Sequence, residues 1–207
     1  MRNFSLPSLV ILAVAITTSG CTRPEPSSPL ERYRAQNTDL QKIRRIAILP
    51  IDARGVPQQS VELINSTLAT ALAARYDVVP LQRRPSGLVQ PAGAALLDDL
   101  VDANDRLMAD AVLQVKITDY RPYEPPAITM SMRMISTTNA QVLWSVTGTL
   151  DSARPSVEKR LKEYYAKSHG ADDSLLGWRA LLMVERRYAQ FAANEFLLSM
   201  GSQARRP

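Results

Sequence analysis

The sequence predicts an α/β (α+β) sandwich, in which helices pack on a mixed sheet of about five strands. Three observations support this class. Short apolar runs of strand length alternate with longer segments whose apolar residues recur at helical spacing. Two alternating segments then follow the third strand with no helix between them, which is typical of an antiparallel hairpin. The predicted order is therefore βαβαβββ, followed by helices toward the C-terminus.

The first half of this pattern begins with "RRIAILPID" at residues 44–52. Its continuous apolar run, residues 46–49, is typical of a strand buried on both faces. Residues 58–75 follow as a helix and residues 76–81 as a second strand. A second helix is expected at 93–108 and a third strand at 109–120.

Residues 127–137 and 142–147 alternate apolar and polar side chains and predict the hairpin. Helices are then expected at 155–168 and 174–199. Two helices have a predicted inward face, made of Leu96, Leu97, Leu100, Val101 and Leu107 in the second helix and Leu181, Val184, Tyr188, Phe191 and Leu198 in the last.

Composition restricts the function classes. The 207 residues are 45% hydrophobic and 22% charged, which is typical of a globular domain. The net charge of +5 is spread over arginine pairs without any nucleic-acid-binding motif, so no nucleic-acid partner is expected. One cysteine and one histidine exclude cysteine-cluster and multi-histidine metal sites, and we expect neither metal nor cofactor.

Residues 1–20 have the pattern of a secretory signal peptide: a basic start, an apolar run of about ten residues and a small-residue end. The run is too short to cross a bilayer comfortably as a permanent helix. The sequence Ser19-Gly20-Cys21 resembles a bacterial lipobox, although Thr18 stands where that motif prefers leucine. The resemblance implies cleavage between Gly20 and Cys21 and acylation of Cys21, for example with palmitate.

By resemblance to enterobacterial sorting, Thr22 after the cysteine implies an anchor in the bacterial outer membrane, facing the periplasm. Residues 21–42 are rich in proline near their start and predict a flexible linker, about 65 Å long when stretched. A single domain is expected over 43–200 and a disordered tail over 201–207.

Four segments, "RRIAILPID", "ALAARYDVVP", "ADAVLQVKITDY" and "MRMISTTNAQVLWS", resemble the TolB N-terminal-like fold. That fold is shared by the curli-secretion lipoprotein family and by lipoprotein activators of penicillin-binding proteins. The resemblance covers about residues 43–150 and implies a non-enzymatic binding or assembly factor of the cell envelope. Gln114, and Asn139-Ala140 in the hairpin turn, depart from the family pattern.

Few side chains suggest catalysis. His169 lies beside Ser168 and Asp172 in a polar segment, but residues so close in sequence do not make an oriented triad, and we expect no catalytic residue. The aspartates of residues 98–105 are expected to be a solvated helix face. Met130, Met132 and Met134 are expected to pack a sheet against a helix, with a soft partner surface as the alternative.

The segment "DYRPYEPP" offers a candidate contact loop, because tyrosine and proline are rigid and amphipathic. Its candidate partner contacts are Tyr120, Tyr123, Pro125 and Pro126. The expected partners are the membrane, through the N-terminal lipid, and an envelope protein, with self-association left open. Two alternatives are a small-molecule or glycan-binding module, with the ligand between the sheet and the last helices, and a hydrolase that uses His169.

Overall fold

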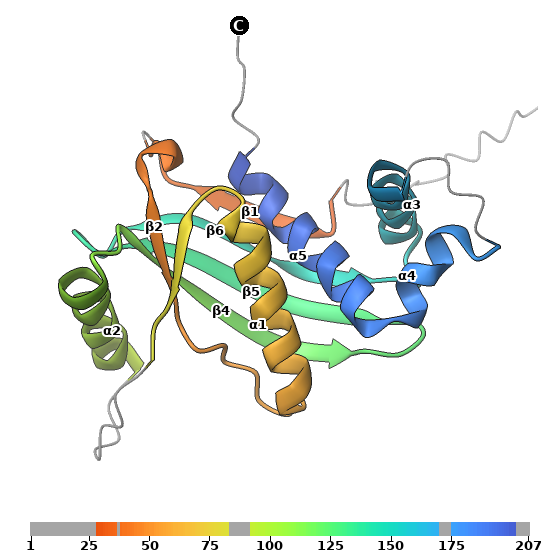
Figure 1. Cartoon of the computed structure of the whole chain (residues 1–207), viewed down its shortest axis with the longest axis horizontal. Coiled ribbons are helices and arrows are strands. Elements are labelled where there is room, and N and C mark those ends of the chain that lie inside the picture. The colour runs from red at the N-terminus through yellow and green to blue at the C-terminus, as the bar shows by residue number, and fades with distance from the viewer. Residues whose placement is uncertain (1–27, 37, 83–91, 170–174, 202–207) are drawn as a thin grey trace, which may run out of the picture.

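The structure, a computed structural model, describes residues 28–36, 38–82, 92–169 and 175–201. The predictions for the signal peptide, Cys21 and residues 202–207 lie outside these ranges. One six-stranded sheet of order β1-β6-β5-β4-β2-β3 carries helices on both faces (Figure 1). The predicted mixed sheet is confirmed, and the strand beyond the expected five is β1 (Leu30–Arg34).

The parallel half of the sheet follows the predicted order. It consists of β2 (Arg45–Ile48), α1 (Gln58–Ala73), β3 (Asp77–Pro80), α2 (Ala92–Leu107) and β4 (Ala111–Arg121). Strand β2 lies between β3 and β4 and is parallel to both. Residues 46–49 are buried, and they contribute alternately to the apolar clusters on the two sheet faces, as predicted for a strand covered on both sides.

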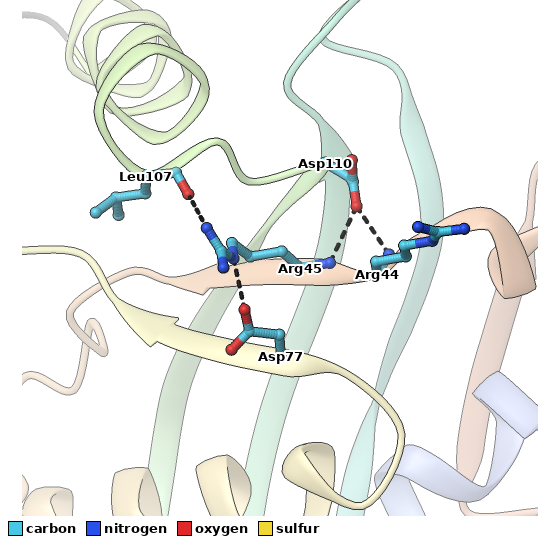
Figure 2. Close-up of polar contacts among 5 residues, drawn as sticks. All are labelled: Arg44, Arg45, Asp77, Leu107 and Asp110. Carbon is cyan, nitrogen blue, oxygen red and sulfur yellow. Dashed lines mark hydrogen bonds and ion pairs between the residues drawn. The ribbon is translucent and has the colours of Figure 1, made fainter.

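Asp110, the residue just before β4, binds the start of the neighbouring strand β2 (Figure 2). Its Oδ2 accepts hydrogen bonds from the backbone N–H groups of Arg44 and Arg45, at 2.8 and 3.0 Å. The Arg45 guanidinium pairs with Asp77 through Nε at 2.6 Å and donates to the Leu107 carbonyl at 3.1 Å. Arg45 therefore links β2 to β3 and to the end of α2.

Strands β5 (Ala127–Ser136) and β6 (Val142–Asp151) form the predicted antiparallel hairpin. Met130, Met132 and Met134 are at most 1% exposed, so they are core residues. In the hairpin turn, Ala140 has a φ of 55°. This is the left-handed region, which glycine occupies at lower cost than alanine.

Strand β1 corrects the predicted linker over 21–42. It pairs antiparallel with β6, and a 3₁₀ helix, η1 (Leu40–Lys42), follows it. Leu30, Ala35 and Leu40 are buried and hold this segment on the core. The close approach depends on Gly148, because a Cβ there would meet the Pro29 carbonyl oxygen and Leu30. The polar composition of 28–42 did not indicate a strand, because β1 pairs with β6 through its backbone while most of its side chains are exposed.

The C-terminal helices are α3 (Pro155–His169), η2 (Gly177–Arg179), α4 (Ala180–Met183) and α5 (Glu185–Gly201). The single helix predicted over 174–199 was wrong, because Val184 is extended, with φ −124° and ψ 112°. Its carbonyl accepts hydrogen bonds from Arg187 and Tyr188 and so starts α5. The predicted tail begins at 201, the last residue of α5.

Helices α1, α3, α4 and α5 share the larger apolar cluster on one sheet face, while α2 covers part of the other (Figure 1). Arg160 of α3 pairs with the buried Glu195 of α5 at 2.7 Å. Four residues predicted to face inward are instead exposed, by 43 to 58%: Leu97, Val101, Val184 and Leu198. The buried faces of α2 and α5 are therefore narrower than the apolar pattern indicated.

Candidate partner-binding surface

Several segments that are distant in sequence meet at one end of the sheet, the end where β6 leads into α3. Arg121 of β4, Ala127 of β5 and Asp151 of β6 lie side by side there, and Arg121 pairs with Asp151 at 3.1 Å. The chain also enters the domain on this side, because Leu30 pairs with Gly148 near the end of β6. We call this edge the α3 end of the sheet.

The loop between β4 and β5 presents some of the predicted contact residues at the α3 end. Tyr123 is 80% exposed, and Pro125 is exposed beside it. Pro126 is buried, and its carbonyl accepts a 3.0 Å hydrogen bond from the Ser152 N–H. Only Tyr123 and Pro125 of the predicted set are therefore freely presented to a partner; Pro126 holds the loop on the turn after β6.

Tyr120, the fourth predicted contact, faces the protein itself. Its ring is half-buried against the core, and its hydroxyl donates a 2.7 Å hydrogen bond to Oε1 of Glu185. Burial, and then the hydrogen bond to the carboxylate, raise the pKa of Tyr120 well above its ordinary value, and the nearby Tyr123 raises it further. Tyr120 is thus a positioning residue, which fixes the start of α5 beside the loop.

The junction between α4 and α5 adds two exposed apolar residues, Met183 at 66% and Val184 at 44%. Val184 directly precedes Glu185, which the Tyr120 hydroxyl holds. We call Tyr123, Pro125, Met183 and Val184 together the Tyr123 surface. The sequence did not indicate its second half, because the helix break at Val184 contains neither proline nor glycine.

The residues considered for catalysis are Ser168, His169 and Asp172, and the structure does not bring them together as a described site. Ser168 Oγ donates a 2.6 Å hydrogen bond to the Tyr164 carbonyl within its own helix. His169 is the last residue of α3, and Asp172 lies outside the described residues. Of the aspartates in α2, Asp99 is buried rather than solvated, and Asp102 pairs with Arg106 at 3.1 Å. The described ranges contain no cluster of three or more His, Cys, Asp or Glu suited to a metal ion.

Several grooves lie on the α1 side of the sheet. A polar groove of about 550 Å³ runs between α1, α3 and α5, and its lining residues are Ser66, Thr67, Thr70, Ala71, Tyr164, Arg186, Gln190 and Asn194. A more apolar groove of about 630 Å³ lies between α1 and the ends of β2 and β3. The polar groove is bounded by helices, so it is not the space between sheet and helices that the ligand-binding alternative envisaged.

None of the helices formed by residues 28–36, 38–82, 92–169 and 175–201 combines the length and apolarity needed to cross a bilayer. No protein-family model and no curated protein matches the chain.

Solved structures that share part of the fold include the PelC dodecamer of Paraburkholderia phytofirmans, with a TM-score of 0.43 and 20% identity over 63% of this chain and 86% of that one. Lipoprotein GNA1162 of Neisseria meningitidis matches with a TM-score of 0.42 and 16% identity, over 63% of this chain and 99% of that one. The LpoB C-terminal domain of Salmonella enterica matches with a TM-score of 0.38 and 15% identity, over 53% of this chain and 84% of that one. These likenesses are of fold alone.

Proposed function

We propose that the protein is a lipid-anchored, non-enzymatic binding factor of the bacterial cell envelope. Cys21 carries the acyl chains that hold it at the periplasmic face of the outer membrane. The Tyr123 surface then binds an envelope protein. The lipobox-like Ser19-Gly20-Cys21 supports the anchor, and the exposure of Tyr123 supports the partner surface.

The observation that carries the binding role is an 80% exposed tyrosine on a loop that is fixed at both ends. Arg121 pairs with Asp151 before the loop, and the Pro126 carbonyl is hydrogen-bonded after it. A tyrosine held in this way loses little conformational entropy on binding, which is why tyrosine is enriched among residues that dominate interface energies. Met183 and Val184 expose apolar area just before Glu185, the residue that binds the Tyr120 hydroxyl.

Site-specific photo-crosslinking in cells tests this role. A photoreactive phenylalanine analogue at position 123 is expected to give a discrete adduct with one envelope protein. The same analogue at Tyr33, an exposed tyrosine on β1, is the matched control and should not give that adduct. Against the identified partner, Tyr123→Ser should weaken binding about thirtyfold, as expected for loss of about 2 kcal/mol. Equal adducts from both positions, or none, would contradict the proposal.

A ligand-binding module is the second candidate, and the polar groove favours it. Hydroxyl, amide and guanidinium groups converge there beside the ring of Tyr164, which suits an anionic oligosaccharide. Arg186 lines this groove, whereas Arg187, which is also exposed, does not. Carboxylated oligosaccharides should therefore raise the melting temperature of wild type and Arg187→Gln, but not of Arg186→Gln. An equal response of the two variants would remove this candidate.

A further inference from the structure

A group of exposed apolar residues precedes η2, apart from the Tyr123 surface. Leu175 is fully exposed and Leu176 is 51% exposed. Trp178 follows them in η2, only partly buried. We call Leu175, Leu176 and Trp178 the leucine tip. Adjacent leucines exposed to this degree are costly in water, and nothing else in the described ranges covers them.

Basic side chains flank the leucine tip. Lys162 Nζ lies 5.2 Å from the centroid of the Trp178 ring and also pairs with Glu158 at 2.7 Å, and Arg179 Cζ lies 5.0 Å from the same centroid. This combination suits the boundary of a lipid bilayer: leucines enter the acyl region, tryptophan prefers the interface, and lysine and arginine reach the phosphates. Because Glu158 compensates the charge of Lys162, the exposed Arg179 is the main charge here that complements an anionic lipid surface.

The position of the tip relative to the anchor supports the same occupant. Only residues 22–29 separate Cys21 from Leu30, the first residue of β1. An extended chain of that length spans no more than about 30 Å, half the reach of the predicted linker. Strand β1 starts at the α3 end of the sheet, and η2 packs on α3 through Lys162 and Trp178 (Figure 1).

We propose that the leucine tip inserts into the surface of the anionic bilayer that carries the acyl chains of Cys21. The lipid holds the protein at the membrane, and the tip orients the α3 end toward it. This inference rests on the proposed anchor for its orientation, but the contact itself is measurable without acyl chains. It also places the Tyr123 surface close to the membrane, within reach of a partner embedded there.

Vesicle partitioning tests the contact. The chain from Thr22 lacks Cys21 but keeps the whole domain, because both core clusters lie between Leu30 and Met200. It is mixed with vesicles of phosphatidylglycerol and phosphatidylethanolamine, or of phosphatidylcholine alone. Of the two tryptophans, Trp144 is 1% exposed, so a blue shift in emission on binding reports Trp178.

Binding to the anionic vesicles, with a blue shift, is expected for wild type. The double variant Leu175→Ser/Leu176→Ser should partition about tenfold more weakly. The control Leu97→Ser/Val101→Ser removes two apolar residues of α2 that are each 58% exposed, and it should bind like wild type. Absence of binding by wild type, or equal losses in both variants, would overturn the inference. If Cys21 is labelled with palmitate but the leucine tip does not bind vesicles, the proposed anchor is supported and this inference is refuted.

Discussion

The Tyr120 hydroxyl donates a 2.7 Å hydrogen bond to Oε1 of Glu185, and so joins β4 to the first residue of α5. Glu185 also lies in the first turn of α5, where a negative charge is favourable. The pair fixes the helix break at Val184 beside the β4–β5 loop. The Tyr123 surface therefore depends on a contact between residues that lie 65 positions apart in the chain.

Tyr120→Phe removes this hydrogen bond and keeps the ring. We expect the free energy of unfolding to fall by about 1.5 kcal/mol, since the acceptor is charged but partly solvated. Urea unfolding measures the loss, and amide exchange at the start of α5 should become faster. Tyr33→Phe, on an exposed tyrosine of β1, is the control and should change neither quantity. Equal losses in the two variants would show that the contact with Glu185 contributes nothing.

Tyr188 predicts a loss of stability at alkaline pH. Its hydroxyl donates a 2.8 Å hydrogen bond to the Leu150 carbonyl, and burial, with a contribution from Asp151, raises its pKa above the ordinary value. The unfolded chain releases this proton near pH 10, whereas the folded protein retains it. Stability due to Tyr188 is therefore complete below pH 10 and falls above it, by up to about 1.4 kcal/mol per pH unit.

Denaturant titrations of wild type and Tyr188→Phe between pH 8 and 11 measure this effect. The variant should be less stable than wild type below pH 10, because the Leu150 carbonyl loses its donor. The difference between the two proteins should then shrink as the pH rises further. A constant difference across pH 10 would show that the Tyr188 pKa is not raised.

Gly148→Ala should displace β1. The new Cβ would meet backbone of Pro29 and Leu30 rather than a flexible side-chain end alone, so the strand must move away from β6. We expect a loss of about 1–3 kcal/mol, as for other overpacked sites, and faster amide exchange over 30–34. Thr147→Ala, at the exposed neighbouring position on β6, should leave β1 in place. Unchanged exchange in Gly148→Ala would contradict the close packing of β1.

Ala140→Gly should stabilise the protein. Alanine is strained at a φ of 55°, whereas glycine is not. The gain, measured by thermal or urea unfolding, is expected to be about 0.5–1 kcal/mol. It is less than the full relief of strain, because glycine also increases the entropy of the unfolded chain, which opposes folding. Thr138→Gly in the same turn, where φ is not positive, should destabilise instead. A loss of stability in Ala140→Gly would refute the left-handed conformation.

The order of the elements could be predicted from the sequence because each carries its own period. The run 46–49 is apolar throughout, which is typical of a strand covered on both faces, and the methionines of β5 alternate with polar residues. Strand β1 could not be found in this way. Its residues 31–33 are all exposed, and its pairing depends on the absence of a side chain at Gly148, more than a hundred residues away.

The candidate site was predicted only in part, because it also depends on contacts between residues that are distant in the chain. Composition singled out Tyr123 and Pro125, which are exposed on a loop as expected. It also selected Tyr120, whose role follows from a partner, Glu185, that no local pattern indicates. Val184 has the helical spacing of a core residue, but its backbone is extended because α4 ends there.

Metabolic labelling with palmitate tests the central claim, that Cys21 anchors this protein to the membrane. Wild type and Cys21→Ala are expressed in the same bacterial host with labelled palmitate, and both are then purified. We predict that label enters wild type and is absent from Cys21→Ala, with wild type alone retained in the outer-membrane fraction. Equal labelling of the two proteins, or none in wild type, would contradict the account.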